Sequence, residues 1–500
     1  MTSRLITLPR PRVAADKLGY FRAGTIGGRR LLTGDDGSWH FLEPGDYADF
    51  LAGRIGGDDP RAVPLRAKGF LRDGLDLEAL AERMKRRKRF VGMGPHLHIL
   101  ITTLRCNQSC RYCHASRTDM DRVDTDMSIA TAKRVVDLAM TTTSPYVNFE
   151  FQGGEPTVNM DVIKFVVEYS REKNKVEGKE LAHSLVTNFT YMTEENAAWL
   201  VANDVLVCTS LDGPQELHDW NRLWKKDGSA FGSVMRWIHH FNAAYVAKGL
   251  DPELWHVDAL MTTTRKSFEF QREIVDLYVE LGIRNLHVRP LNPYGFAVDQ
   301  WKRVGYTMDE YLDFYAAMLD DILERNLNGV EIIEGTSAIF LAKMLTEDDP
   351  NFVDIRSPCG AGTGQVAYNY DGKLFTCDEG RMTSAMGSDM FGIGSVDAAN
   401  LAEVLKHPTV RAMAVASLQD SLPGCSECWN KPYCGVCPMH EYMTSGDLFK
   451  RPDSPKCREH YTIASLLFEK LGDDPDGRIA DIFRRWTINR PRETGSECAV

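Results

Sequence analysis

The sequence predicts an α/β fold in its central part, between a small α+β unit at the N-terminus and a cysteine-rich part at the C-terminus. Three observations predict it: apolar strands alternate with helices, polar residues recur where these strands end, and most cysteines fall into two groups. A chain of 500 residues is long enough for two or three domains. The segments that we expect are 1–90, 91–305, 306–354, 355–460 and 461–500.

The N-terminal segment combines a hairpin pattern with helical patterns. Residues 29–42 contain two short strand patterns around an Asp36-Gly37 turn, and residues 43–55 have the pattern of a helix. A basic stretch at 80–90 predicts a helical linker whose charges lie on a solvated face. We therefore expect a small α+β unit here.

Six apolar strand patterns alternate with helical patterns between residue 96 and about residue 295. Their lack of polar alternation is typical of a parallel sheet that is covered on both faces. Ser128 and Thr193 are the expected N-caps of two of the helices. A repeated βα unit of this length predicts either an α/β barrel or a doubly wound sheet. The strands are expected at 96–103, 146–151, 183–189, 205–213, 255–264 and 285–291, and the helices at 127–140, 161–173, 193–203, 231–249 and 270–282.

The pattern changes after the sixth strand. Residues 305–347 are mostly helical, and residues 365–377 predict a hairpin with an Asp371-Gly372 turn. An amphipathic helix is expected within 458–487, and the tail at 491–500 is expected to be disordered.

Charge and composition exclude some classes of protein. The formal net charge is -11 and the pI is about 5.7, which is unfavourable for non-specific nucleic-acid binding. The N-terminus has no apolar secretory region, and no apolar run is long enough to span a bilayer. We expect a cytoplasmic protein without nucleic-acid or membrane partners, in which cysteines do not form disulfides.

The twelve cysteines are grouped rather than scattered. Three lie at 106–113, seven lie between 359 and 457, and Cys208 and Cys498 fall outside these groups. Clustered thiols in a cytosolic chain indicate metal binding. Cys208 is expected to be a buried small side chain and Cys498 an inert thiol of the tail.

The first group, Cys106, Cys110 and Cys113, has the spacing C-x3-C-x2-C. A structural zinc site needs four ligands, so zinc would require His114 or a distant residue as the fourth. An iron–sulfur cube normally takes four thiolates as well. Three thiolates on a short loop can bind three irons of a [4Fe–4S] cluster and leave the fourth iron open to a ligand. We expect this open cluster rather than zinc.

The C-terminal group contains two C-x2-C pairs at 425–437. Such pairs can build a zinc ribbon, but ribbons usually separate them by more than the five residues found here. Seven cysteines also exceed the needs of one zinc ion. These thiols are Cys359, Cys377, Cys425, Cys428, Cys434, Cys437 and Cys457.

Polar residues recur at the carboxyl ends of the expected strands. In an α/β barrel the active site lies at that face, so these residues predict one shared site. An alternative for Glu155 is a solvated turn, and an alternative for Asn188 is a structural turn. The residues are Gly153, Gly154, Glu155, Thr187, Asn188, Ser210, Asp212, Arg289 and Asn292.

The cysteine loop resembles the C-x3-C-aromatic-C motif of radical S-adenosylmethionine (SAM) enzymes, with Tyr112 at the aromatic position. The resemblance implies a partial (β/α)6 TIM-like barrel in which SAM chelates the open iron. An electron from the cluster then yields a 5′-deoxyadenosyl radical, which takes a hydrogen atom from substrate; the protein aims this chemistry and excludes water.

The same resemblance implies roles for residues at the strand ends. Gly153 and Gly154 would let the backbone approach a ligand. Glu155 would accept a hydrogen bond from the ammonium of SAM. Asn188 would contact the cofactor, Ser210 its ribose or carboxylate, and Arg222 its carboxylate. His218 and Asp219 would order the loop between Ser210 and Arg222.

The C-terminal cysteines resemble the SPASM extension of radical SAM enzymes, which carries two auxiliary [4Fe–4S] clusters. The resemblance assigns Cys359, Cys377 and Cys437 to cluster I, and Cys425, Cys428, Cys434 and Cys457 to cluster II. The gap from Cys434 to Cys437 holds two residues where three are usual in this extension. No further cysteine lies in the hundred residues before Cys359, so cluster I could have an open iron.

Asp378 directly follows Cys377. In sulfatase-maturing relatives an aspartate at this place accepts a proton when the substrate radical is oxidised, and such a carboxylate would have a tuned pKa. The alternative is an ordinary turn aspartate.

The chain also resembles, over residues 18–460, the radical SAM maturases of the His-Xaa-Ser peptide system. This implies a ribosomally made precursor peptide as substrate, crosslinking as the first expected modification, and a low-potential electron donor such as flavodoxin or ferredoxin. The N-terminal unit faintly resembles a leader-peptide recognition element, which can take a peptide as an added strand; the alternative is a structural cap. Two other functions stay open: a sulfatase-type maturase that forms formylglycine, and a non-catalytic zinc or iron–sulfur scaffold.

Overall fold

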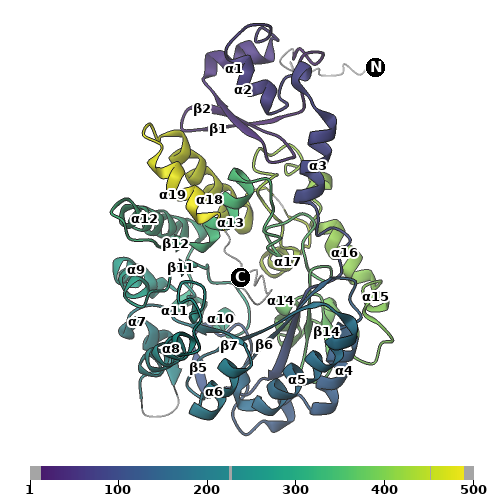
Figure 1. The fold of residues 1–500 in the computed structure, drawn as a ribbon, viewed down its shortest axis with the longest axis vertical. Coiled ribbons are helices and arrows are strands. Elements are labelled where there is room, and N and C mark those ends of the chain that lie inside the picture. The colour runs from purple at the N-terminus through teal and green to yellow at the C-terminus, as the bar shows by residue number, and fades with distance from the viewer. Residues whose placement is uncertain (1–12, 225–227, 451, 489–500) are drawn as a thin grey trace, which may run out of the picture.

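The computed structural model describes residues 13–224, 228–450 and 452–488. The N-terminal unit lies at one end and the α/β part at the other, with the C-terminal helices between them (Figure 1). Residues 1–12, the expected disordered tail at 491–500 and Cys498 lie outside the described residues.

The N-terminal unit is a three-stranded antiparallel sheet with helices on it. The expected hairpin is confirmed by strands β2 (Arg29–Thr33) and β3 (Trp39–Leu42), and β1 (Arg22–Ile26) adds a strand that the sequence did not predict. Phe50 and Leu32 are fully buried in its core. The helices are α1 (Pro44–Leu51), α2 (Ala62–Ala67), η1 (Arg72–Gly74) and α3 (Leu77–Arg87).

An eight-stranded mixed sheet forms the centre of the molecule, with the order β10-β8-β7-β6-β4-β13-β14-β15. The first six strands in this order pair in parallel, so five of the six expected strands lie side by side as predicted. These five are β4 (Leu97–Thr103), β6 (Tyr146–Gly153), β7 (Glu180–Thr187), β8 (Leu206–Ser210) and β10 (Asp258–Leu260).

Helices that follow the strands pack against the sheet (Figure 1). The two expected caps are confirmed, because Ser128 accepts from the Thr131 amide and Thr193 from the Asn196 amide. The helices are η2 (Val123–Thr125), α4 (Ile129–Ala139), η3 (Pro156–Asn159), α5 (Met160–Glu177), α6 (Glu194–Ala202), α7 (Gln215–Asn221), α8 (Ala230–Ala247), η4 (Arg265–Glu269) and α9 (Gln271–Glu280).

The sixth expected strand differs from the prediction. β11 (Asn285–Leu286) has two residues and pairs with β12 (Ile333–Glu334) instead of joining the central sheet. The buried Glu334 carboxylate accepts a hydrogen bond from the Val288 backbone amide at 3.1 Å. This bond takes the place of a further backbone hydrogen bond to a neighbouring strand. The Arg289 amide then donates to the His287 carbonyl at 3.0 Å, so the backbone turns directly after the strand.

The expected boundary near residue 355 does not separate two sheets. β13 (Gln365–Tyr368) pairs in parallel with β4, and β14 (Lys373–Phe375) and β15 (Gly392–Ser395) extend the same sheet in antiparallel fashion. The predicted hairpin around Asp371-Gly372 is confirmed as β13–β14. The C-terminal part is therefore fused to the α/β part through this sheet.

Long C-terminal helices join the N-terminal unit to the rest. The Trp39 and Phe468 rings meet edge to face at 5.2 Å, and Thr33 donates to the Trp429 carbonyl at 2.8 Å.

The helices from residue 296 onward are α10 (Phe296–Asp299), α11 (Trp301–Val304), α12 (Met308–Leu327), α13 (Gly335–Leu345), α14 (Asp378–Ala385), η5 (Asp389–Phe391), α15 (Leu401–Val404), α16 (Pro408–Ala416), η6 (Gln419–Ser421), α17 (Pro438–Ser445), α18 (Pro455–Gly472) and α19 (Arg478–Trp486).

Within the described part of the chain, none of the helices has the length and apolar character that crossing a membrane would require.

Candidate active site

The first cysteine group lies on a loop that leaves the carboxyl end of β4. A short ladder between β5 (Gln108–Cys110) and β9 (Arg222–Trp224) holds the loop, with Cys110 directly opposite Arg222. Burial raises the pKa of Cys106 and raises that of Cys110 to about 12, and in both cases the neighbouring thiols add to the effect. The three thiols therefore lie close enough to sense one another's charge.

Asn188 reaches this group from the end of β7. Its amide nitrogen Nδ2 lies 3.6 Å from the Cys106 sulfur, and the Gln108 backbone amide lies 3.4 Å from the same sulfur. The structure thus brings the third strand end to the cysteine loop, as the strand-end argument predicted.

Gly153 and Gly154 pack against protein backbone. A Cβ on Gly153, which has φ +140°, would lie 2.1 Å from the Thr103 carbonyl oxygen, and one on Gly154 would lie 2.3 Å from that of Arg105. The glycines let the end of β6 pass against the chain that leads into the cysteine loop. The expectation that they bring backbone close to a ligand stays a prediction, since their immediate neighbours are protein atoms.

Replacement of Gly154 by alanine should therefore destabilise the protein by about 1–3 kcal/mol, because two backbone segments would have to separate. Thermal unfolding of the purified protein measures this. Gly45→Ala is a matched control, because a Cβ there meets nothing within 4 Å and alanine favours the helix. Equal melting temperatures for Gly154→Ala and wild type would contradict the packing argument.

Glu155 is fully buried, and burial raises the pKa of its carboxyl group. The carboxyl accepts the Thr157 amide at 3.1 Å, the Thr187 hydroxyl at 2.7 Å and the Asn188 amide at 2.8 Å. Glu155 therefore ties the end of β6 to the end of β7. The alternative that Glu155 lies in a solvated turn is wrong. The contact of Glu155 with the ammonium group of a cofactor stays a prediction.

Asp212 is the centre of a buried hydrogen-bond network that the sequence did not identify. Its carboxylate accepts the Tyr112 hydroxyl at 2.7 and 2.9 Å, Arg222 at 3.0 and 3.2 Å, and the Asn221 amide at 3.1 Å. Burial alone would raise the pKa of Asp212, but Arg222 outweighs it and lowers the pKa. Tyr112 and Arg222 are thus fixed by protein, and their predicted cofactor contacts remain predictions.

The loop after β8 is ordered as predicted. The His218 ring accepts the Asp212 amide at 3.3 Å, and Asp219 accepts the Ser229 hydroxyl at 2.7 Å and the Phe231 amide at 2.9 Å. Ser210, half-buried, ends β8 at the same edge of the sheet.

Comparison with known proteins identifies the family. The model of the Radical SAM superfamily matches residues 100–246. A cysteine-type anaerobic sulfatase-maturating enzyme from Clostridium perfringens (strain 13 / Type A) is 32% identical over 311 residues, which are 57% of this chain and 75% of that enzyme. The chain belongs to the radical SAM superfamily.

Solved structures share the fold of this radical SAM protein. anSMEcpe with bound AdoMet and Cp18Cys peptide has a TM-score of 0.62 at 18% identity and covers 78% of this chain and 99% of its own. Streptococcus suis SuiB bound to precursor peptide SuiA has a TM-score of 0.52 at 14% identity and covers 88% of this chain and 99% of its own.

Polar side chains on β6 and β7 are hydrogen-bonded to one another on one face of the sheet. Glu150 accepts the Gln152 amide at 2.5 Å and the Ser184 hydroxyl at 3.4 Å. Burial raises the pKa of Glu150, and the charge of Asp378 adds to this effect. Glu150 and Gln152 were missed, although the polar alternation at 148, 150 and 152 in the sequence signals a polar face.

Asp378 begins α14 near the first cysteine loop. It is buried and bonded to Arg381 at 3.1 Å, and Arg381 also donates to the Ala115 carbonyl at 3.0 Å. Asp378 therefore follows Cys377 in the chain and is tied through Arg381 to the segment just after Cys113. Its role in proton transfer stays a prediction.

The seven C-terminal thiols fall into two separate sets in space. Cys359, Cys377 and Cys437 share one buried apolar cluster. The other set surrounds one cavity of about 460 Å³ and consists of Cys425, Cys428, Cys434 and Cys457. These are the same two sets that the resemblance to SPASM proteins implied.

The donor sets of the thiols fit iron–sulfur clusters. Such clusters are held by thiolates that are spread around several irons. A cavity lined by four thiols and a loop carrying three thiols are suited to such clusters.

Proposed function

We propose that the chain is a radical SAM maturase that modifies a ribosomally made precursor peptide of the His-Xaa-Ser type. The observation that carries this proposal is the convergence of three loop thiols with the ends of β6, β7 and β8 at one edge of the sheet. The peptides in the titles of the structural neighbours, Cp18Cys and SuiA, support a peptide substrate.

Cys106, Cys110 and Cys113 would hold a [4Fe–4S] cluster with an open iron for SAM, which together supply a 5′-deoxyadenosyl radical. The Asn188 amide donates toward the Cys106 sulfur, and Tyr112, buried and bonded to Asp212, fixes the loop. Glu155, Ser210 and Arg222 would contact SAM from the strand ends. Burial of Glu155 and Arg222 keeps water away from these two groups.

Cys359, Cys377 and Cys437 would hold one auxiliary [4Fe–4S] cluster, and Cys425, Cys428, Cys434 and Cys457 the other. Asp378 would accept a proton from the substrate, since it lies beside Cys377 and its charge acts on Glu150 of β6. The electrons would come from or pass to a low-potential protein such as flavodoxin or ferredoxin, in the cytoplasm.

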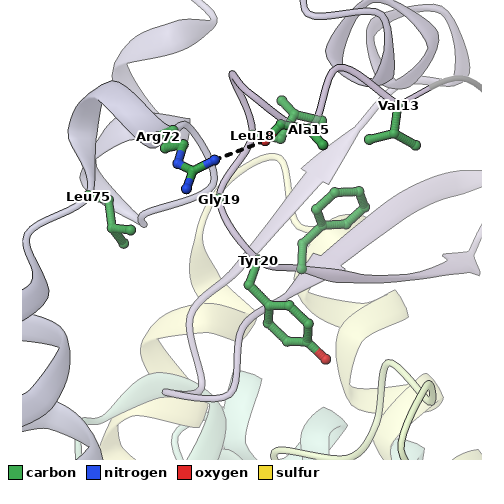
Figure 2. A pocket seen from close by; sticks show the side chains of 8 residues that line it. Val13, Ala15, Leu18, Gly19, Tyr20, Arg72 and Leu75 are labelled. Carbon is green, nitrogen blue, oxygen red and sulfur yellow. Dashed lines mark hydrogen bonds between the residues drawn. The ribbon is translucent and has the colours of Figure 1, made fainter.

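The N-terminal unit would bind the leader of the precursor peptide. In its sheet, order β1-β2-β3, β1 and β3 are edge strands that can accept an added strand. Beside β1 lies a pocket of about 300 Å³, where Arg72 donates to the Ala15 carbonyl and Tyr20 turns its ring toward the C-terminal part (Figure 2). Tyr20 is 60% exposed and offers an aromatic surface to a peptide.

Anaerobic co-expression with a His-Xaa-Ser peptide, followed by mass spectrometry, tests the proposal. Each side-chain crosslink should remove two hydrogens, a loss of about 2 Da, because the radical takes one hydrogen and oxidation of the coupled product releases the second. The product must be absent when Cys106, Cys110 and Cys113 are replaced by alanine. A peptide of unchanged mass in both cases would contradict the peptide assignment.

Two alternatives predict different results. A sulfatase-type maturase, as the relative from Clostridium perfringens is named, would convert a cysteine or serine to formylglycine in a sulfatase-derived peptide. A non-catalytic scaffold would release no 5′-deoxyadenosine from SAM under reduction. The enzyme proposal predicts about twelve irons per chain, from three cubes, and release of that product.

A further inference from the structure

Three cations surround the indole ring of Trp220, beside the first cysteine loop. The guanidinium carbon of Arg111 lies 4.9 Å from the ring centre and that of Arg303 lies 5.6 Å from it. The Lys266 Nζ lies 5.7 Å from the same ring centre. These cations come from three parts of the chain: the cysteine loop, α11 and η4. We call Trp220, Arg111, Lys266 and Arg303 the basic patch.

The basic patch is joined to the cysteine loop through Arg111, which lies between Cys110 and Cys113 in the chain. The Arg111 Nε donates to the Trp220 carbonyl at 2.8 Å, and the Arg111 backbone amide donates to the Asn221 carbonyl at 2.9 Å. A partner that binds at Trp220 would therefore lie next to the loop that carries the first group of thiols.

Carboxylates neutralise only part of the charge of the basic patch. Lys266 is paired with Glu216 at 2.8 Å, whereas Arg111 and Arg303 have no ion pair with a carboxylate among the described residues. Asp299 is exposed on the preceding helix α10, and no ion pair joins it to Arg303. The basic patch thus keeps positive charge, in a chain whose formal net charge is -11.

Exposed apolar side chains border the cysteine loop near the basic patch. Leu223 is 40% exposed and Phe296 is 36% exposed. The Arg117 guanidinium lies 5.9 Å from the Phe296 ring centre and donates to the Ser109 hydroxyl at 2.9 Å. Ser109 lies opposite Leu223 in the ladder of β5 and β9. The Phe296 backbone amide donates to the Cys113 carbonyl at 2.9 Å, which holds this ring beside the loop.

Apolar side chains next to unpaired cations form a surface that suits an acidic protein partner. Most of this chain is acidic, so it repels such a partner and steers it toward the cations. A flavodoxin has the matching chemistry, because it is acidic and exposes the apolar edge of its flavin ring. A flavin that is held against Leu223 and Phe296 would be separated from the thiols by the cysteine loop alone.

We propose that the basic patch, with Leu223 and Phe296, is the docking surface for an acidic flavodoxin that reduces the group bound by Cys106, Cys110 and Cys113. The flavin gives up one electron and the bound group takes it up, so no atom is transferred. The inference rests on the proposed function, which assigns a cluster to these three thiols. The cations of the basic patch position the donor and are not catalytic residues.

Release of 5′-deoxyadenosine with two different reductants tests this in the full-length, anaerobically reconstituted protein. Dithionite is small and needs no docking surface, whereas a flavodoxin reduced by its NADPH-dependent reductase needs one. Arg303→Glu should lower the flavodoxin-driven rate by about tenfold at limiting flavodoxin, because the new carboxylate repels the partner. The dithionite-driven rate should stay unchanged. Added salt should lower the wild-type flavodoxin-driven rate and reduce its difference from the variant.

Two further variants and a binding measurement serve as controls. Arg303→Lys keeps the charge and should keep the flavodoxin-driven rate. Lys406→Glu reverses an exposed charge in the C-terminal part of the chain and should change neither rate. Calorimetry of oxidised flavodoxin binding at low salt does not depend on SAM cleavage. The affinity should fall in Arg303→Glu and stay at the wild-type value in Lys406→Glu.

The outcomes separate this inference from the proposed function. Wild-type flavodoxin binding and flavodoxin-driven rate in Arg303→Glu would overturn the docking surface and leave the cluster assignment intact. An equal loss of both rates would show that Arg303 supports the loop and would overturn the docking surface as well. A change in the rate with an acidic ferredoxin alone would overturn the choice of a flavodoxin. Wild-type protein that releases no 5′-deoxyadenosine with dithionite would overturn the proposed function and this inference together.

Discussion

Replacement of Cys106, Cys110 and Cys113 by alanine should abolish reductive cleavage of SAM and remove about four of twelve bound irons per chain. The three thiols lie on one loop, opposite Arg222 and beside Asn188. Without them no thiolate remains at the end of β4 to hold a cluster. Liquid chromatography of 5′-deoxyadenosine after reduction with dithionite, together with iron analysis, measures both effects.

Cys208→Ala is the matched control for this triple variant. Cys208 lies within β8 and is half-buried, so its loss removes one sulfur without touching the cysteine loop. This variant should keep all of its iron and its SAM cleavage. If the triple variant still released 5′-deoxyadenosine, the assignment of the loop would be wrong and the peptide proposal would fall with it.

Local sequence signals were sufficient for the parts of the fold that depend on neighbouring residues. The Asp36-Gly37 and Asp371-Gly372 turns each join the two strands of a hairpin. Ser128 and Thr193 cap the helices that they precede. Each of these features is decided within a few residues by turn geometry or by a side chain that satisfies a helix amide.

Long-range pairing explains which parts of the sheet the sequence did not predict. β13 lies beside β4 across more than 250 residues of chain, and β11 pairs with β12 instead of β10. Sequence pattern identifies a strand but not its partner, because an apolar strand can pair with any other. The single sheet that crosses residue 355 could be seen only in the structure.

The candidate site shows the same division. The thiols and strand ends were predicted because parallel strands bring their carboxyl ends to one edge. The interactions of Asp212 were missed because its partners, Tyr112 and Arg222, arrive from a different loop and from β9. The burial of a charge pair cannot be deduced from the spacing of its residues in the sequence. In this protein the buried pair of Asp212 and Arg222 holds the cysteine loop in place.

The largest effect on stability is expected for Asp212→Ala. The Asp212 side chain has no exposed surface and that of Arg222 is 9% exposed, so the substitution leaves a buried guanidinium without its carboxylate. Removal of one partner from such a pair costs about 3–5 kcal/mol. The same change frees the Tyr112 hydroxyl and loosens Arg222, which lies opposite Cys110, so cluster retention should fall as well.

Thermal unfolding and iron retention of the same samples measure these two effects. Asp212→Ala combined with Arg222→Met should recover part of the lost stability, because the unpaired charge is removed, whereas additive losses would show that the pair contributes no coupling. Asp124→Ala breaks an exposed pair with Arg122 and should leave unfolding unchanged.

The stability that Asp212 contributes should depend on pH, because Arg222 lowers the pKa of Asp212 in the folded protein. This contribution should be present above the ordinary carboxyl pKa and lost as the pH falls through the folded-state pKa. Two results together would show that this network does not hold the loop. The melting temperature of the wild type would not fall with acidification, and Asp212→Ala would melt at the same temperature as the wild type.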